Sequence, residues 1–180
     1  MREKFPTWAR IILVLIGCSL IVHGGLVLLG EYVSKGGTTQ TISFHTQVCA
    51  YKNNVLIGCN HNILTQPGKD HIKYLLGIGL NSPAIYLALG NTTAPTETDT
   101  SLPGEITGCG LDRAQGTYYS NGVGNWTISH TWTSSCTITV NTTGLYNATS
   151  GGTFFSGTSF PDVNLQADDQ LTINYTIWVS

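Results

Sequence analysis

The chain is poor in charge. Only 10% of its 180 residues are Asp, Glu, Lys or Arg, and the formal net charge is −2. From residue 36 onward there are four basic residues, Lys52, Lys69, Lys73 and Arg113, against eight acidic ones. Binding to nucleic acid through release of counterions needs clustered Lys and Arg, so we expect no nucleic-acid partner.

Sequence motifs of the common enzyme classes are also missing. There is no phosphate-binding Walker loop, no His-Glu-x-x-His pair, no Cys-x-x-Cys pair and no Gly-x-Ser-x-Gly elbow. The candidate residues for acid–base catalysis are scattered, with no spacing that requires them to meet: His45, His61, His71, His130, Asp112 and Asp169. The sequence therefore predicts no enzyme, with no catalytic residues, no cofactor and no metal.

Three polar or charged groups have structural interpretations. Four residues near the C-terminus have oxygen ligands suited to Ca²⁺, but the calcium-loop pattern is missing and a solvated turn is preferred: Asp162, Asn164, Asp168 and Asp169. His130 lies between Trp126, Ile128 and Trp132 and is expected to be a packed or surface-strand residue rather than a metal ligand. Arg113 is expected to pair with Glu105 or Asp112 and so fix the fold, the alternative being contact with a neighbouring subunit.

One long stretch has no charge at all. Residues 11–29 are apolar, and a helix of that length covers about 28 Å, close to the roughly 30 Å hydrocarbon core of a bilayer. Arg2, Lys4 and Arg10 precede this stretch, so the positive-inside rule places the N-terminus in the cytoplasm. We predict a basic leader over residues 1–10, a transmembrane or filament-core helix over 11–35 and an extracellular head over 36–180. The alternatives are a cleaved signal peptide and a lipoprotein signal.

Small residues in this stretch are spaced for packing between helices. Gly17 and Gly24 are seven residues apart, as are Cys18 and Gly25, and this spacing aligns them along one face of a helix. Small residues let membrane helices approach closely. We therefore expect copies of the predicted helix to pack together, the alternative being that Gly is simply common in membrane helices.

Glycans or self-association would compensate for the low charge. Charged side chains normally keep a protein surface hydrated and prevent association. Five Asn-x-Thr acceptor sequences predict N-linked glycans on the exterior of a surface protein: Asn91, Asn125, Asn141, Asn147 and Asn174. The other way to hide an uncharged surface is to pack it against copies of the same chain.

Beyond residue 36, apolar and polar residues alternate in short runs separated by turn signals, as in antiparallel sheets. The expected strands cover residues 38–51, 55–59, 85–89, 110–120, 125–133, 137–141, 153–160 and 171–179. A short helix is expected over 69–76, and a polar loop outside the core over 91–103. We predict a mainly β fold, an antiparallel β-sandwich of immunoglobulin-like or jelly-roll type preceded by one long apolar N-terminal α-helix. The last strand is expected to close its own sheet, with donation to a neighbour as the alternative.

The expected hairpins pair four of the five cysteines. Centring the first hairpin on its Asn-Asn turn puts Cys49 opposite Cys59. Centring the second on the Gly-rich turn 121–124 puts Cys109 opposite Cys136. Two disulfides formed in this way indicate an oxidising exterior.

Several turn and strand segments in the second half of the chain occur in a familiar order: residues 85–90 (IYLALG), 102–105 (LPGE), Arg113, 126–128 (WTI), 144–148 (GLYNA), 151–153 (GGT) and 165–169 (LQADD). They resemble a β-sandwich domain of tail-fibre and decoration proteins of tailed phages, which lack the apolar stretch. The layout of an apolar N-terminal helix before a Thr- and Asn-rich β head is similar to that of archaeal type IV pilus subunits. Both resemblances imply a repeated structural subunit outside a particle or cell.

Taken together, these features predict a non-enzymatic structural subunit of an extracellular assembly, either a virion surface protein or a cell-surface filament, anchored or assembled through its N-terminal helix. The expected partners are copies of the chain, a lipid membrane contacted through residues 11–29, and a host-surface receptor. The alternative is a membrane-anchored adhesin or receptor-binding head that acts as a monomer, with residues 91–103 and 121–124 as contact loops.

Overall fold

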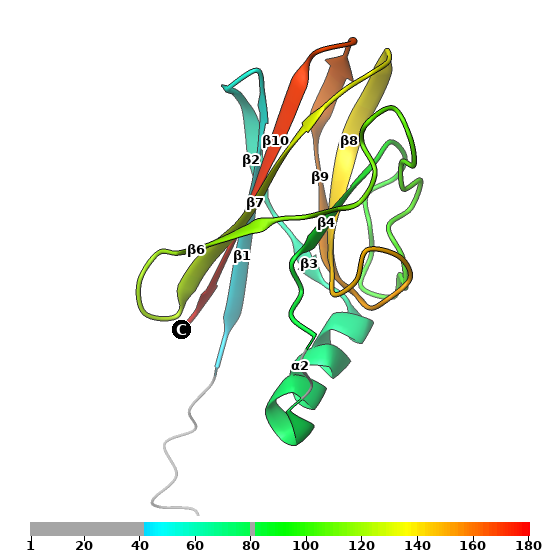
Figure 1. The fold of residues 1–180 in the computed structure, drawn as a ribbon. Coiled ribbons are helices and arrows are strands. Elements are labelled where there is room, and N and C mark those ends of the chain that lie inside the picture. The colour runs from blue at the N-terminus through cyan, green and yellow to red at the C-terminus, as the bar shows by residue number, and fades with distance from the viewer. Residues whose placement is uncertain (1–41, 80–81) are drawn as a thin grey trace, which may run out of the picture. The chain divides into compact units, whose positions relative to one another are not determined.

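The computed structural model describes residues 42–79 and 82–180. The chain divides into two compact units, residues 1–41 and 42–180, and the described residues all belong to the second, which is called the head below. The head is a β-sandwich of two five-stranded antiparallel sheets, and the one helix among the described residues lies at one end of it (Figure 1).

Each sheet contains strands from both halves of the head. Sheet A has the order β2-β1-β10-β7-β6 and sheet B the order β3-β9-β8-β4-β5. Sheet A consists of β1 (Phe44–Lys52), β2 (Val55–His61), β6 (Thr117–Ser120), β7 (Asn125–Thr133) and β10 (Gln170–Val179). Sheet B consists of β3 (Ile63–Leu64), β4 (Tyr86–Gly90), β5 (Ala114–Gln115), β8 (Ile138–Tyr146) and β9 (Phe154–Leu165).

The expected fold is wrong in its helical part. It included one long apolar α-helix before the sandwich, whereas the described residues contain a single helix, α2 (Gln66–Ile78), of 13 residues. No helix within residues 42–79 and 82–180 is both long enough and apolar enough to cross a bilayer. The segment 11–35, where the long helix was expected, lies outside the described residues, as do its small residues Gly17, Cys18, Gly24 and Gly25.

Local signals at both ends keep α2 short. Thr65 caps its N-terminus, because the Thr65 side chain accepts a hydrogen bond from the Gly68 N–H at 3.1 Å, and Pro67 occupies the first turn, where proline is tolerated. Gly79 ends the helix with a φ of 68°, a left-handed conformation that favours glycine. His71 is buried on the inner side of α2, edge-on to Phe155.

Strand β10 forms the centre of sheet A. Its Leu171, Ile173, Tyr175 and Ile177 are each at most 2% exposed, and they alternate with polar residues that point to the opposite face, as the period of a strand requires. The strand pairs with β1 on one side and with β7 on the other. Because both of its edges are paired within one chain, β10 closes its own sheet here.

The main core fills the space between the sheets. Its buried side chains come from both layers and include Leu87, Leu89, Ile128, Trp132, Leu145, Leu165, Ile173 and Tyr175. The Tyr175 hydroxyl lies in this core, within 2.5 Å of the Ser156 hydroxyl, and it also accepts a hydrogen bond from Asn62. Burial raises the pKa of Tyr175 well above its ordinary value, so this tyrosine stays neutral and its polar group stays satisfied.

The chain changes sheets where one continuous strand over residues 110–120 was expected. Strand β5 pairs with β4 in sheet B, and β6 pairs with β7 in sheet A. Gly116 lies at the crossing, where its N–H donates to the Ile85 carbonyl at 2.8 Å. A Cβ at this position would lie 2.4 Å from Ile128 Cγ2. The close approach of the two layers therefore requires glycine here.

Residues 91–113 contribute to a second, smaller apolar cluster. The sequence placed residues 91–103 outside the core, but Leu102 is only 3% exposed and packs with Ala88, Tyr146 and Phe154. The Leu102 N–H donates to the Tyr146 hydroxyl at 2.6 Å. Pro95 is buried as well, so the expectation was wrong for Pro95 and Leu102.

Two glycine substitutions should have opposite effects on stability. Gly116→Ala should lower the free energy of unfolding by about 1–3 kcal/mol, because the new methyl group overpacks the contact with Ile128. Gly77→Ala should raise it by about 0.5 kcal/mol, because Gly77 lies in α2 with nothing within 4 Å of the added Cβ and alanine favours helix. Chemical denaturation of both variants measures the effects, and equal midpoints would contradict the crossing at Gly116.

Candidate interaction surface

The outer face of sheet A is built from short polar side chains that bond across strands. The register pairs the odd-numbered residues of β7 with the even-numbered residues of β10. Three such pairs are hydrogen-bonded: Thr127 with Thr176 at 2.8 Å, Ser129 with Asn174 at 2.6 Å, and Thr131 with Thr172 at 2.7 Å. These cross-strand bonds fix the side chains and satisfy most of their polar groups.

This surface, called the hydroxyl face below, carries no Asp, Glu, Lys or Arg side chain among the described residues. Strand alternation and the registers place the following residues on it: His45, Gln47, Cys49, Tyr51, Leu56, Cys59, His61, Thr117, Tyr119, Asn125, Thr127, Ser129, Thr131, Thr133, Thr172, Asn174, Thr176 and Trp178. Two copies of such a surface repel each other little, because neither carries a net charge from acidic or basic side chains. The surface therefore does not oppose contact with an identical one.

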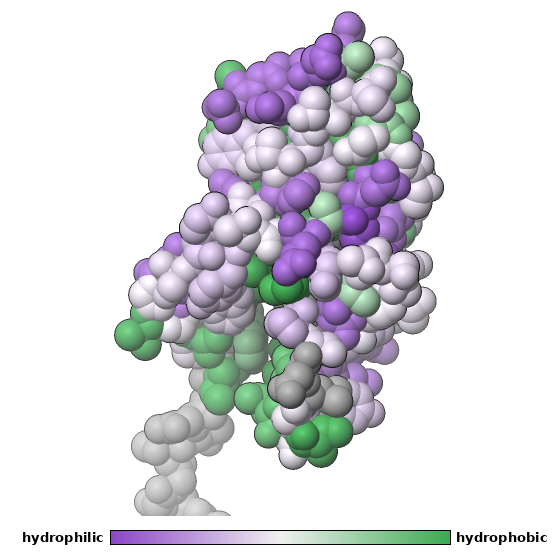
Figure 2. Space-filling model, viewed as in Figure 1, coloured by the Kyte–Doolittle hydropathy of each residue, from purple (hydrophilic) through white to green (hydrophobic). Residues whose placement is uncertain are grey.

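Charged side chains of the head gather elsewhere. One group lies at the end formed by the β1–β2 and β9–β10 turns, where the Lys52 ammonium is 2.8 Å from the Asp169 carboxylate. The others lie in residues 97–113, beside sheet B, and on α2, which carries Lys69, Asp70 and Lys73. In the space-filling view the most hydrophilic residues collect at the upper end of the head (Figure 2). The low charge noted in the sequence is therefore unevenly distributed in space.

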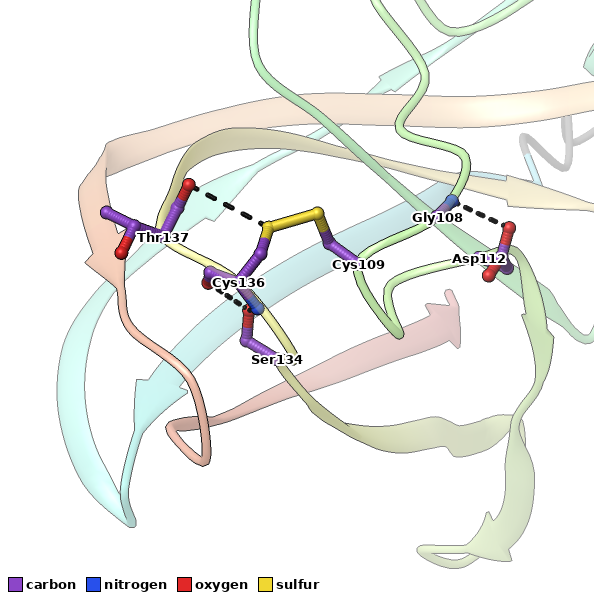
Figure 3. Close-up of a disulfide and its surroundings, with 6 residues drawn as sticks. All are labelled: Gly108, Cys109, Asp112, Ser134, Cys136 and Thr137. Atoms are coloured by element: carbon purple, nitrogen blue, oxygen red, sulfur yellow. Dashed lines mark hydrogen bonds between the residues drawn. A yellow bond between two sulfur atoms is a disulfide. The ribbon is translucent and has the colours of Figure 1, made fainter.

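Both expected disulfides are present. Cys49 and Cys59 lie directly opposite each other in the β1–β2 register, as the hairpin turn predicted. The bond between Cys109 and Cys136 joins two turns rather than two paired strands (Figure 3). The hairpin argument for this second pair was incomplete, because the chain has changed sheets between Cys109 and β6.

The asparagines of the five sequons lie in different surroundings. Asn91 is exposed in the turn after β4, whereas the others are half-buried. Asn125 and Asn174 lie on the hydroxyl face. Asn141 donates from Nδ2 to the Asp162 carboxylate at 3.2 Å, and its Oδ1 is buried without a partner. Asn147 Oδ1 accepts a hydrogen bond from the Thr153 N–H at 2.6 Å.

The scattered histidines of the sequence are not brought together as a catalytic group. His45 stacks on Trp178, and His61 Nδ1 lies 3.2 Å from the Thr46 carbonyl. His71 Nε2 donates to the Ser82 carbonyl at 2.8 Å. Within residues 42–79 and 82–180, no group of three or more His, Cys, Asp or Glu side chains is arranged to hold a metal ion.

His130 packs as the sequence suggested. Its ring lies 4.6 Å from that of Trp132 in an edge arrangement, and Nδ1 donates to the Gln115 carbonyl at 3.0 Å. Partial burial lowers the pKa of His130, because desolvation disfavours the charged imidazolium. The neutral ring therefore serves the packing of β7 against β5.

Three of the four residues with oxygen ligands suited to Ca²⁺ have other side-chain partners. Asp169 accepts hydrogen bonds from Lys52 and from Asn53 Nδ2, the latter at 2.8 Å. The Lys52 ammonium, with Asn53 and the Gln166 N–H, lowers the pKa of Asp169 to about 2. Asn164 accepts from Thr139, and Asp162 accepts from Asn141. The bonds of Asp169 tie the β1–β2 and β9–β10 turns together, whereas those of Asn164 and Asp162 join β9 to β8.

Arg113 fixes the segment that lies beside sheet B. Its guanidinium binds Glu105 through two bonds, 2.9 Å from Nε and 2.6 Å from Nη2, and Nη1 donates to the Ala148 and Gly151 carbonyls. It also lies over the Tyr146 ring, 3.4 Å from the centroid. Of the two partners predicted for Arg113, the structure selects Glu105. Asp112 instead accepts from the Gly108 N–H.

Burial around this network also affects Tyr146. The ring is 1% exposed, and desolvation raises the pKa of Tyr146 to about 12. The hydrogen bonds from Arg113 to Glu105 and the stacking of Arg113 on Tyr146 hold this segment in place. This network is called the latch below, and it is the intramolecular role predicted for Arg113.

No protein-family model matches the chain, and no curated protein matches it. The resemblances to phage and pilus proteins stay predictions. The hydroxyl face was not found from the sequence, because its members come from five strands and only the registers bring them together. The alternating polar residues of 125–133 and 171–179 were the available signal.

Removing the Arg113 guanidinium should destabilise the head. Arg113→Ala leaves Glu105 without its cation and two carbonyls without a donor, so we expect a loss of about 3 kcal/mol in the free energy of unfolding. The matched control is Lys73→Ala, which removes the solvent-exposed ion pair with Asp70 and should leave the unfolding midpoint unchanged. Equal midpoints for both variants would show that the latch is not structural.

The sequons should differ in occupancy. When the protein is expressed in a host that glycosylates Asn-x-Thr sites, glycopeptide mass spectrometry should find a glycan on Asn91, which is exposed. Asn141 should be unmodified, because its side chain is half-buried and attachment at Nδ2 removes its bond to Asp162. Accordingly, Asn91→Gln should reduce the mass of the intact protein by a glycan and Asn141→Gln should not. A glycan on Asn141 of the folded protein would contradict this assignment.

Proposed function

We propose that the chain is a non-enzymatic structural subunit of an extracellular assembly, on the surface of a virion or of a cell, whose heads pack against one another through the hydroxyl face. The observation that carries the proposal is the absence of charge from that face among the described residues. Pairing two such faces desolvates no ion, and ion desolvation is the largest cost of burying a polar surface.

The composition of the hydroxyl face suits contact between copies. Cores of protein interfaces are depleted in charged residues, and Lys, Glu and Asp are under-represented there. Tyr51, Tyr119 and Trp178 supply aromatic area among the hydroxyl groups. Cross-strand hydrogen bonds already hold residues such as Thr131 and Thr172 in place, so little side-chain entropy is lost when a neighbour covers them.

Two other features support display outside a cell. Disulfides persist in oxidising compartments, and the head contains two of them. The uncharged stretch 11–29 is long enough to hold the chain to a membrane or to pack with its copies in a filament. Under this proposal the stretch provides attachment and the head provides the contacts between neighbours.

Placing positive charge on the hydroxyl face should prevent assembly. Thr117 and Thr131 are exposed on β6 and β7, so the double variant Thr117→Lys, Thr131→Lys should fold normally but repel its copies. Negative-stain microscopy and light scattering of the purified full chain should show ordered assemblies for the native protein and dispersed particles for this variant.

The control places the same charge elsewhere. Thr107 and Ser150 are exposed outside the hydroxyl face, and the variant Thr107→Lys, Ser150→Lys should assemble like the native protein. Circular dichroism verifies that both variants are folded. If the native chain is dispersed, the monomeric adhesin or receptor-binding head is favoured instead, and if the first variant assembles normally, the contact lies on another surface.

A further inference from the structure

An apolar pocket opens at the end of the head where β1 begins. It has a volume of about 320 Å³ and lies between α2, the residues just before β4 and the ends of the sheet A strands. Its lining includes Phe44, Leu76, Ile85, Tyr118, Trp126 and Ile177. The main core does not fill this space, so an apolar concavity faces outward.

Large apolar side chains are exposed around the pocket. Ile42 is 68% exposed, Leu76 79%, Ile78 71% and Val123 106%. Backbone bonds link the segments of Ile42 and Val123 through the end of β10: the Ser43 and Ser180 backbones bond to each other, and the Val179 N–H donates to the Gly124 carbonyl. The pocket and these four side chains are called the apolar tip below. In Figure 2 hydrophobic residues gather at this lower end of the head.

Charge is nearly absent from this end. Residues 42–45, 72–79, 82–86, 117–126 and 177–180 contain a single charged side chain, Lys73. They contain no acidic side chain, and Tyr118 and Trp126 bring aromatic rings of the kind that favour the membrane–water boundary. A surface with this composition is compatible with the interfacial region of a lipid bilayer.

The course of the chain favours a bilayer over other occupants. Ile42, the first described residue, belongs to the apolar tip, so the preceding residues reach the head at this end. Twelve residues, 30–41, separate Ile42 from the uncharged stretch 11–29. Fully extended, they span at most about 40 Å. An attachment of residues 11–29 to a membrane therefore confines the apolar tip to the vicinity of that membrane.

We propose that the apolar tip docks on the outer leaflet of the bilayer, with Val123, Leu76 and Ile78 in the interfacial layer and the pocket open toward the acyl chains. This inference rests on the proposed function in its membrane-held form. It assigns to the head a second lipid contact, separate from the stretch 11–29, and it leaves the hydroxyl face free for neighbouring heads.

The test measures the depth of the tip in the full chain rather than membrane association, which residues 11–29 provide by themselves. In a Cys18→Ser background, a fluorophore is attached at Val123→Cys or, as a control, at Val55→Cys. Val55 is 66% exposed in the β1–β2 hairpin at the opposite end of the head. The protein is incorporated into phosphatidylcholine liposomes and isolated by flotation.

The two labels should respond to different quenchers. We expect doxyl-labelled lipid to quench the label at residue 123 and aqueous iodide to quench it several-fold less than the label at residue 55, which should respond to iodide alone. Adding Leu76→Ser and Ile78→Ser should make residue 123 as accessible to iodide as residue 55. The matched change Leu56→Ser, which removes an apolar side chain that is 53% exposed at the opposite end, should have no effect.

The outcomes separate the two proposals. If the protein floats with the liposomes but both labels respond equally to iodide, the docking of the tip is wrong while the membrane-held subunit stands. If residue 123 is protected from iodide without quenching by lipid, and more so at higher protein density, a second copy covers the tip and the proposal is also overturned. Failure to float contradicts the attachment through residues 11–29 and the docking with it.

Discussion

The pairing of β10 with β1 on one edge and β7 on the other is the constraint on which the rest of the head depends. Because side chains alternate along a strand, the same residues that bury Leu171, Ile173, Tyr175 and Ile177 must turn Thr172, Asn174 and Thr176 outward. The core and the hydroxyl face are thus two sides of one pattern. A shift of one residue in this register would expose the core side chains and bury the hydroxyl groups, so the buried face holds the outer face in place.

Two of the ion pairs of the head fix the backbone. Lys52 and Asp169 join two turns at one end, and Arg113 with Glu105 secures the segment beside sheet B. Other charges, Lys69, Asp70 and Lys73 on α2 among them, form exposed ion pairs, and hydroxyl, amide and apolar groups make up most of the remaining surface. The charged side chains are therefore distributed unevenly over the surface. This distribution produces two uncharged regions, the hydroxyl face and the apolar tip, which differ because one is hydrogen-bonded within itself and the other exposes aliphatic side chains.

The sequence predicted those parts of the head that depend on local pattern. Alternation identified the strands around β1, β7 and β10, and the Asn-Asn turn fixed the Cys49–Cys59 pair. It missed features that depend on contacts between distant segments. The need for glycine at position 116 follows only from the placement of β5 and β6 in different sheets. Leu102 was missed because it lies in a run of polar residues. The long apolar helix expected before the sandwich has no counterpart in the described residues, where Thr65 and Gly79 limit α2 to 13 residues.

The two proposed surfaces restrict how heads can be arranged. The strands of sheet A run from the apolar tip to the charged turns. In a head whose tip rests on a bilayer, the hydroxyl face is therefore roughly perpendicular to the membrane plane. Two such faces can meet around a two-fold axis perpendicular to the membrane with both tips still at the lipid. An isologous contact of this kind closes on itself and gives a pair. Growth beyond pairs then needs a second surface, either residues 91–113 beside sheet B or contacts between copies of the stretch 11–29. The elementary unit expected from the head alone is therefore a dimer.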